Sequence, residues 1–313
     1  MKVCMINDIC WMAEALSRYL PYDVKHIPRS RAVLSKTIGL AVRVLLAEAD
    51  LYHVFYVLQD AYLALRMRKK PIVGHACGSD VRDTLHSKWG WMVRHNLKNL
   101  DYVLSSQPTI VSQIRQYTDK VEYFPIPIDP RLFSAPSFPE YGAEFTVLYS
   151  SPVDFRVKGA DKVMRAVSLV NQPITLVAIK YGPDLERAYE LSRRLGLRVR
   201  WIDRQPHSSI ADCYCAADLV LGNFGVGQLD TTVIEAMACG RPVVHHLAPG
   251  FYPNVPLRSY QSVAEFADDI EKLLMERKAA EQQVQRQLDY VKIHYADHAV
   301  KRLVEVYEQA SQS

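Results

Sequence analysis

A lysine and a glycine stand at a predicted turn from a strand into a helix, in the segment YSSPVDFRVKGADKVMRAV (residues 149–167). The ammonium group of Lys158 can offset the charge of a bound diphosphate. Backbone N–H groups at the helix start, directly after Gly159, can bind the same oxygens. Arg156 is a second cation in this loop, and the hydroxyl groups of Ser150 and Ser151 are candidate phosphate contacts. The pattern predicts an anion site.

A carboxylate occupies a similar position in AADLVLGNFGVGQLDTTVIEAMACGRPVVHH, the run that begins at Ala216. A short apolar strand leads into a glycine-bearing loop, and Asp230 or Thr231 is placed to cap the helix that follows. Glu235 lies one turn inside that helix, where it cannot hold a phosphate but can accept hydrogen bonds from sugar hydroxyls. The alternative is a solvated helical glutamate without a ligand.

A third polar loop, IVGHACGSDVRD, follows a predicted strand that ends at Val73. His75 or Asp80 is placed to bind sugar hydroxyls or to position an acceptor. Two structural alternatives stay open, because Asp80 can instead cap the following helix and His75 can be a hydrogen-bonded core histidine.

The elements that position these loops form two series of alternating strands and helices, which predicts an α/β fold with parallel sheets. The Pro/Ser-rich stretch 134–139 separates the series. We predict two Rossmann-like domains, residues 1–138 and 139–290, with ligands bound in the cleft between them. The remainder, residues 291–313, is a predicted amphipathic helix. The predicted strands begin near residues 1, 54, 72, 102 and 121 in the first domain and near 145, 174, 199, 219 and 242 in the second.

The run EAMACGRPVV, with Glu235 at its head, resembles the donor-binding signature of GT-B glycosyltransferases, in particular the retaining family 4. The resemblance implies that Glu235 binds the ribose of a nucleotide sugar and that Lys158-Gly159 is the family's KG motif. It also implies that the last helix returns to the first domain, and that the loop at Gly78-Ser79-Asp80 faces the transferred sugar from the acceptor side. By the same resemblance, the donor sugar lies against Gly227, Gln228, Leu229, Asp230 and Thr231, and the nucleobase lies near Tyr181, Gly182, Ile202 and Arg204.

Three features depart from the family pattern. A first glutamate usually stands eight positions before the second, and here Gly227 stands at that position. The loop after the first strand is Asn7-Asp8-Ile9 rather than a glycine-rich loop. Arg156 is two residues before Lys158, whereas the partner arginine of the family is about five residues before it.

Composition and charge limit the remaining possibilities. Residues 1–140 contain 18 Lys and Arg against 13 Asp and Glu, a net charge of +5, whereas the remainder has 20 against 21, a net charge of −1. This excess favours an anionic partner of the first domain, such as a membrane surface, and it is too small to indicate nucleic acid. We interpret the six cysteines as reduced and the chain as cytoplasmic, because no run of ~20 apolar residues and no signal peptide is present.

Basic residues mix with apolar ones in two predicted helices, and a second stretch combines tryptophan with cations. We interpret both as core-facing stripes with solvated cations, the alternative being a peripheral contact with the inner membrane face. These residues are Lys36, Arg43, Arg66, Arg68, Lys69 and Lys70, then Lys88, Trp89, Trp91 and Arg94.

The sequence therefore predicts a retaining glycosyltransferase of GT-B architecture. It uses a nucleoside-diphosphate sugar as donor, a glycan, lipid-linked or small-molecule acceptor, and no cofactor or obligatory metal. Two alternatives are a catalytically silent GT-B partner subunit and a dinucleotide-dependent oxidoreductase, although no G-x-G-x-x-G follows the first strand of either domain.

Overall fold

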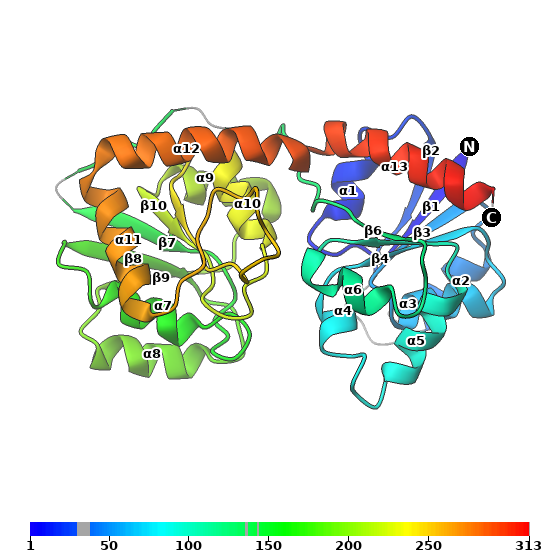
Figure 1. The fold of residues 1–313 in the computed structure, drawn as a ribbon, viewed down its shortest axis with the longest axis horizontal. Helices are drawn as coiled ribbons and strands as arrows, with labels where there is room; N and C mark the ends of the chain where they lie inside the picture. Colours follow the sequence, from blue (N-terminus) through cyan, green and yellow to red (C-terminus); the bar gives the residue numbers. More distant parts are fainter. Residues whose placement is uncertain (30–37, 135–136, 143, 313) are drawn as a thin grey trace. The chain divides into compact units, whose positions relative to one another are not determined.

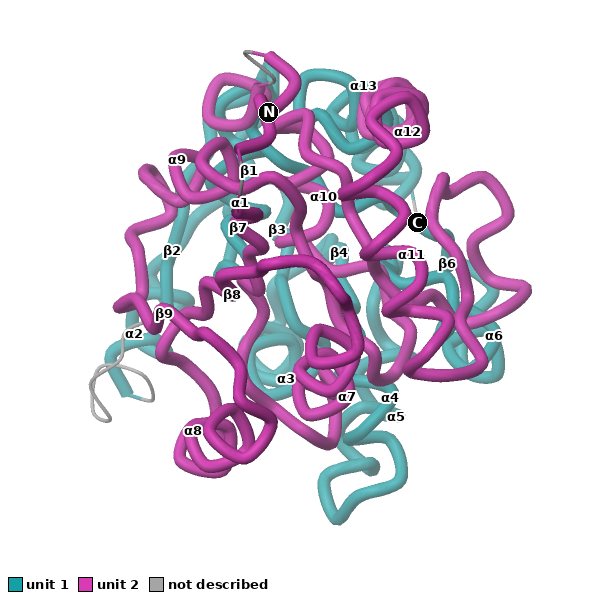
Figure 2. Tube along the Cα trace, turned by 90° about the vertical axis from the view of Figure 1, so that its left-hand side faces the viewer, with its two compact units in different colours: residues 1–129, 293–313 teal, residues 130–292 magenta. Residues whose placement is uncertain are grey.

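The computed structural model describes residues 1–29, 38–134, 137–142 and 144–312, and the chain divides into two compact units. Unit 1 comprises Met1–Asp129 and Ile293–Ser313, and unit 2 comprises Pro130–Lys292 (Figure 2). The change between units at residues 129–130 lies before the domain boundary predicted at 138–139. Lys36 and part of the predicted 134–139 linker lie outside the described residues.

Unit 1 is built on a six-stranded parallel sheet in the order β2-β1-β3-β4-β5-β6. The apolar strands β1, β3 and β4 are central and buried, whereas β2 at the edge is partly exposed. The strands are β1 (Lys2–Ile6), β2 (Asp23–Ile27), β3 (Leu51–Phe55), β4 (Ile72–Ala76), β5 (Tyr102–Ser105) and β6 (Val121–Tyr123).

Helices cover both faces of this sheet, with α1 and the C-terminal α13 on one face and α2, α3 and α5 on the other (Figure 1). Residues 293–313 thus belong to unit 1, and α13 packs against α1 and β4. The helices are α1 (Met12–Ser17), α2 (Leu40–Leu45), α3 (Gln59–Arg66), α4 (Ser79–Arg82), α5 (Gly90–Asn99), α6 (Val111–Ile114) and α13 (Ala296–Ser311).

Unit 2 is a five-stranded parallel sheet in the order β11-β10-β7-β8-β9. Helices α7, α8 and α11 cover one face, and α9, α10 and α12 cover the other (Figure 1). The strands are β7 (Phe145–Tyr149), β8 (Ile174–Ile179), β9 (Val199–Ile202), β10 (Leu219–Leu221) and β11 (Val243–Val244). The helices are α7 (Ala160–Val167), α8 (Leu185–Arg194), α9 (Ile210–Cys215), α10 (Thr231–Ala238), α11 (Val263–Met275) and α12 (Arg277–Val291).

The strand order of unit 2 reverses between β7 and β10, which are neighbours in the sheet but far apart in the sequence. Open parallel sheets bind ligands at such a point, outside the carboxyl ends of the two strands. The loop after β7 carries Lys158, and the loop after β10 leads into α10, which carries Glu235, so the fold brings the two sequence motifs to one edge. Unit 1 has its own reversal between β1 and β3.

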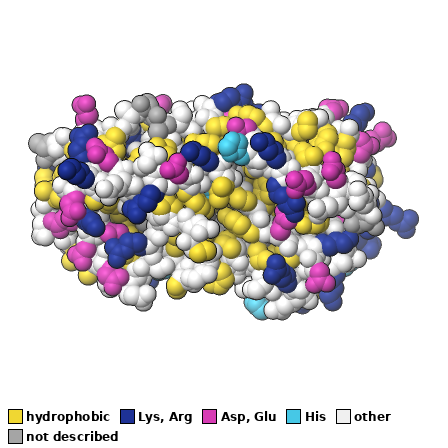
Figure 3. All heavy atoms as spheres, turned by 45° about the horizontal axis from the view of Figure 1, so that its top comes forward, with side chains coloured by type: hydrophobic (Ala, Val, Ile, Leu, Met, Phe, Trp, Pro, Cys, Tyr) yellow, Lys and Arg dark blue, Asp and Glu magenta, His cyan; other side chains and the backbone are white. Residues whose placement is uncertain are grey.

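Other expectations concern the surface and the cysteines. On the face drawn in Figure 3, Lys and Arg side chains are interspersed with Asp and Glu, so no field of a single sign covers that face. All six cysteines are free thiols. Among the described residues, no helix combines the length and the apolar character that a membrane span requires.

Candidate donor site

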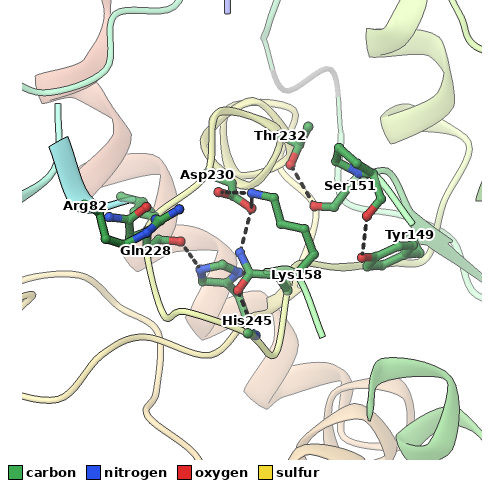
Figure 4. Close-up of polar contacts among 12 residues, drawn as sticks. Arg82, Tyr149, Ser151, Lys158, Gln228, Asp230, Thr232 and His245 are labelled. Atoms are coloured by element: carbon green, nitrogen blue, oxygen red, sulfur yellow. Dashed lines mark hydrogen bonds and ion pairs between the residues drawn. The ribbon is translucent and has the colours of Figure 1, made fainter. Parts of the chain in front are cut away.

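The loop after β7 and the start of α10 meet through an ion pair (Figure 4). Lys158 Nζ donates to both carboxylate oxygens of Asp230, at 2.7 and 2.8 Å, and both side chains are largely buried. The Asn223 side-chain amide donates to Asp230 Oδ2 at 2.6 Å. Burial alone would raise the pKa of the Asp230 carboxyl, but the Lys158 charge and the Asn223 hydrogen bond outweigh it and leave that pKa below its ordinary value.

Asp230 occupies the N-cap position of α10, but its side chain makes no capping hydrogen bond because it is bound to Lys158 and Asn223. The first N–H groups of a helix have no partner within it and form a partly positive anion site. At the same end, Ser151 Oγ lies 3.4 Å from Thr232 Oγ1. The expected capping by Asp230 is therefore replaced by an ion pair beside an uncapped helix start.

A buried histidine holds the loop between β10 and α10 in place. His245 Nδ1 accepts from the Asn223 backbone N–H at 3.0 Å, and Nε2, 3.0 Å from the Gln228 carbonyl oxygen, donates to it. Burial lowers the pKa of His245 to about 4, so the ring is neutral near pH 7. This neutral tautomer supplies one acceptor and one donor, the pair that the loop requires.

Glycines let the two loops contact each other backbone to backbone. A Cβ at Gly159 would lie 2.4 Å from the Phe224 carbonyl oxygen, and one at Gly225 would lie 1.9 Å from the Val157 carbonyl oxygen. Two hydrogen bonds join the same segments, from Phe224 N to Lys158 O at 2.9 Å and from Val226 N to Val157 O at 3.1 Å. Larger residues would separate these loops.

Glu235 is buried, and both of its carboxylate oxygens have partners. Oε1 lies 2.8 Å from His207 Nε2, and Oε2 accepts from the Tyr214 hydroxyl at 2.9 Å. Burial, followed by the Glu235 charge, raises the pKa of Tyr214, so this tyrosine stays protonated as a donor. Glu235 is thus not the solvated glutamate of the sequence alternative, and Ser150 is buried in the same region.

Gly227 has a left-handed backbone (φ 69°), and a Cβ there would lie 2.4 Å from the Ala248 backbone nitrogen. The Ala248 N–H also donates to the Gly227 carbonyl oxygen at 2.8 Å. By the resemblance described above, a first glutamate would stand at this position, and here the Gly227 backbone packed against Ala248 occupies it. Gln228 and Leu229 are buried beside it, and Thr231 is half-buried at the start of α10.

The residues expected near a nucleobase lie at the ends of β8 and β9. The guanidinium of Arg204 lies 4.6 Å from the centre of the exposed Tyr181 ring, and the two groups stack. Val153 N donates to the Tyr181 carbonyl oxygen at 2.6 Å, and Gly182 has no room for a side chain against Val153. Ile202, the last residue of β9, is half-buried, and Arg156 is exposed in the loop after β7.

His75 and Asp80 belong to unit 1 and are fully buried. His75 lies 3.2 Å from His53 and 2.8 Å from the Ser106 hydroxyl, and burial lowers the pKa of its ring to about 3. Asp80 accepts from the backbone N–H groups of Val57, Cys77, Gly78 and Val81. His75 is thus a hydrogen-bonded core histidine, whereas Asp80 lies inside α4 and holds the surrounding backbone rather than capping that helix.

Sequence reasoning missed four polar residues of the candidate donor site, namely His207, Tyr214, Asn223 and His245. Asn223 was the easiest to find, because it directly follows a predicted strand. In unit 1 it also missed the backbone at the β1–β3 reversal, where Asn7, Cys10, Trp11 and Tyr56 have positive φ. Strained non-glycine residues of this kind cluster at functional sites.

Comparison with known proteins agrees with this geometry. The family model described as "Glycosyl transferases group 1" matches residues 144–276, from β7 to the end of α11. The matched residues lie within unit 2. A curated relative, D-inositol 3-phosphate glycosyltransferase 1 of Catenulispora acidiphila, is 29% identical over 53% of this chain and 44% of its own length. The chain thus spans less than half of that relative.

Solved structures of glycosyltransferases share the fold of the whole chain. HepE of Anabaena, in complex with UDP-glucose, matches with a TM-score of 0.78 at 16% identity, over 100% of both chains. Sucrose-phosphate synthase of Thermosynechococcus elongatus matches with a TM-score of 0.78 at 17% identity, over 99% of this chain and 98% of its own. The predicted α/β fold of GT-B type, with two parallel sheets, is confirmed.

Proposed function

We propose that this protein is a glycosyltransferase that moves a sugar from a nucleoside-diphosphate donor to an acceptor with retention of anomeric configuration. The observation that carries the proposal is the meeting of Lys158, Asp230 and the uncapped start of α10 at the strand-order reversal of a group 1 domain. That arrangement places a cation and backbone donors where a diphosphate leaves.

Each part of unit 2 takes a role in donor binding under this proposal. Lys158 and the α10 start bind the diphosphate, and Arg156 extends the positive charge. Glu235 accepts from the ribose hydroxyls, which requires it to share its oxygens with His207 and Tyr214. The Tyr181–Arg204 stack offers a flat face to the base. The loop 227–231 contacts the donor sugar mainly through its backbone.

The acceptor class is the less constrained half of the proposal. We assign a glycan, lipid-linked or small-molecule acceptor to unit 1, where the carboxyl-edge loops are held by Asn7, Asp80 and the His75 hydrogen bonds. His75 and Asp80 then act as supports for these loops, and a direct sugar contact would require the loops to open.

Nucleotide titration tests the donor assignment. Calorimetry with UDP, GDP, ADP and NAD(H) should give binding of at least one nucleoside diphosphate, and UDP-glucose is the first donor to assay because HepE was crystallised with it. Transfer with retention would appear in NMR spectra as an α-linked product from an α-linked donor. A response to NAD(H) alone would instead favour the oxidoreductase.

Metal independence is part of the proposal, because Lys158 and the α10 start supply positive charge of the kind that a divalent cation would supply. We expect that excess EDTA leaves the transfer rate unchanged. A loss of activity that Mg²⁺ or Mn²⁺ restores would refute this point without affecting the donor assignment.

A catalytically silent partner subunit is a second candidate, and the backbone at Gly227 favours it. The family's first carboxylate is missing, and the φ of 69° with the close Ala248 backbone leaves no room for it. Tight binding of a nucleoside diphosphate, with neither donor hydrolysis nor transfer to any acceptor tested, would support this candidate over an active enzyme.

A further inference from the structure

Helix α2 in unit 1 exposes apolar side chains on its outer face. Ile38, just before the helix, is 65% exposed, and Val42, Leu45 and Leu46 are 48%, 57% and 70% exposed. Their spacing of i, i+4, i+7 and i+8 places them along one side of a helix. We call these four residues the α2 stripe. The expected core-facing stripe with solvated cations does not account for this side of the helix.

The opposite side of α2 already fills the core of unit 1. Leu40 is 2% exposed and Val44 is fully buried in the hydrophobic cluster that includes Val54 and Ile72. The stripe is therefore not required to hold the helix on the sheet. Large apolar residues scattered singly on a surface need no explanation, but four within nine residues form a patch that indicates a contact.

Cations surround the C-terminal end of the stripe. Lys69 Nζ donates to the Leu45 carbonyl oxygen at 2.9 Å and to the Ala47 carbonyl oxygen at 2.7 Å, so residues 66–70 lie beside it. Arg66, Arg68 and Lys70 are exposed in that segment. Residues 38–50 and 66–70 together hold five Lys and Arg against two acids, Glu48 and Asp50.

We infer that the α2 stripe is a docking surface for a membrane rich in anionic lipids. The four apolar side chains enter the boundary between headgroups and acyl chains, and the guanidinium groups of Arg66 and Arg68 bind lipid phosphates. A second copy of the chain fits less well. The surface of four side chains is far smaller than the ~800 Å² that each partner buries in a stable interface. A symmetric contact would also bring the two sets of cations together.

Vesicle sedimentation tests the inference with the full chain, and it needs neither donor nor acceptor, so its outcome is separate from that of the proposed transferase activity. The probes are vesicles of phosphatidylcholine alone and of phosphatidylcholine mixed with phosphatidylglycerol. We expect binding to the mixed vesicles only, weakening as salt is added. Equal binding to both vesicle types, or binding to neither, would overturn the inference.

Variants locate the surface. Leu45→Glu with Leu46→Glu should reduce binding by about tenfold or more, because each leucine loses its apolar burial in lipid. The matched control is Leu169→Glu with Met275→Glu, which puts the same charges on exposed apolar residues of unit 2 and should bind like the wild type. A folded Leu45/Leu46 variant that binds like the wild type would refute the assignment.

Two further measurements cover the other outcomes. If the Leu45/Leu46 variant fails to fold by circular dichroism, Arg66→Gln with Arg68→Gln keeps the stripe and should lose the preference for phosphatidylglycerol. An unchanged preference would contradict the inference. Sedimentation velocity without lipid should show no dimer that depends on Leu45 and Leu46, and such a dimer would favour a second copy as the occupant.

Discussion

Lys158 and Asp230 neutralise each other at a place where a diphosphate is proposed to bind. A buried carboxylate without its cation is costly, so the pair holds the ammonium in position before the donor arrives. When a diphosphate binds, Lys158 can contact both anions, because an ammonium group has three donor hydrogens. Under the proposed function Asp230 is thus a positioning residue, and Lys158 is the residue that touches the ligand.

Replacing Lys158 by alanine should weaken nucleoside diphosphate binding by about 10- to 100-fold, the cost of one charge-assisted contact. Calorimetry well below the melting temperature separates this effect from instability. Lys292→Ala is the control, because Lys292 forms an ion pair with Asp289 at 2.8 Å on an exposed surface. Unchanged affinity in the Lys158 variant would refute the site assignment.

A separate prediction concerns Glu235 and the ribose of the nucleotide. The wild type should bind a nucleoside diphosphate about tenfold more tightly than its 2′-deoxy form, and Glu235→Gln should remove much of that preference. Glutamine keeps the side-chain size, so the contacts to His207 and Tyr214 are perturbed as little as possible. If the variant still distinguishes the two nucleotides as the wild type does, Glu235 has a structural role only.

The motifs around Lys158 and Glu235 were predictable at this scale because their chemistry is local in the sequence. Their partners were not. Tyr214 and His207 belong to α9 and the loop before it, and only the packing of α9 against α10 brings them to Glu235. His75 shows the same limit, because its side-chain partners, His53 of β3 and Ser106 directly after β5, are far from it in the chain.

At the scale of elements, the strands of unit 2 follow the apolar runs closely. Strands β7, β8 and β10 begin where they were predicted, because a central parallel strand is a short apolar run, and the edge strand β9 does so too. Strand β2 was missed, since its alternating and mostly exposed residues give no such run. The helix predicted for residues 291–313 is observed as α13, which a short 3₁₀ turn at Lys292–His294 precedes.

The turn at Gly227 is predicted to be intolerant of side chains. Gly227→Ala should lower the free energy of unfolding of unit 2 by more than Gly196→Ala does. Both glycines have φ near 65–69°, but only Gly227 approaches another backbone, and the Gly196 variant carries the left-handed cost of about 1–2 kcal/mol alone. Urea denaturation measures both. Equal losses would show that the Ala248 contact is not restrictive.

At the scale of the whole molecule, buried neutral histidines connect stability to pH. Burial lowers the pKa of His75 to about 3 and those of His245 and His294 to about 4, and it also lowers the pKa of His53. Below the ordinary value of 6.5 the unfolded chain binds protons that the folded chain excludes. This contribution to stability is therefore complete above about pH 6.5 and is lost as the pH falls toward 4.

We expect the free energy of unfolding to fall by up to roughly 1.4 kcal/mol per pH unit for each such histidine in that window. Urea denaturation between about pH 7 and pH 4 measures the slope. His294→Gln should make it shallower, because glutamine can still donate to the Ile126 carbonyl oxygen but does not titrate. A slope that is the same in both proteins would contradict the role of His294.

The backbone contact between the loops after β7 and β10 has a consequence for engineering. Val157 and Phe224 face glycines on the opposite loop, so neither loop can be replaced without matching the other. Chimeras that import residues 153–159 or 222–231 alone from another glycosyltransferase should misassemble. We expect that transplanting both loops together preserves their contact, so the pair is the unit to exchange in order to alter the proposed donor specificity.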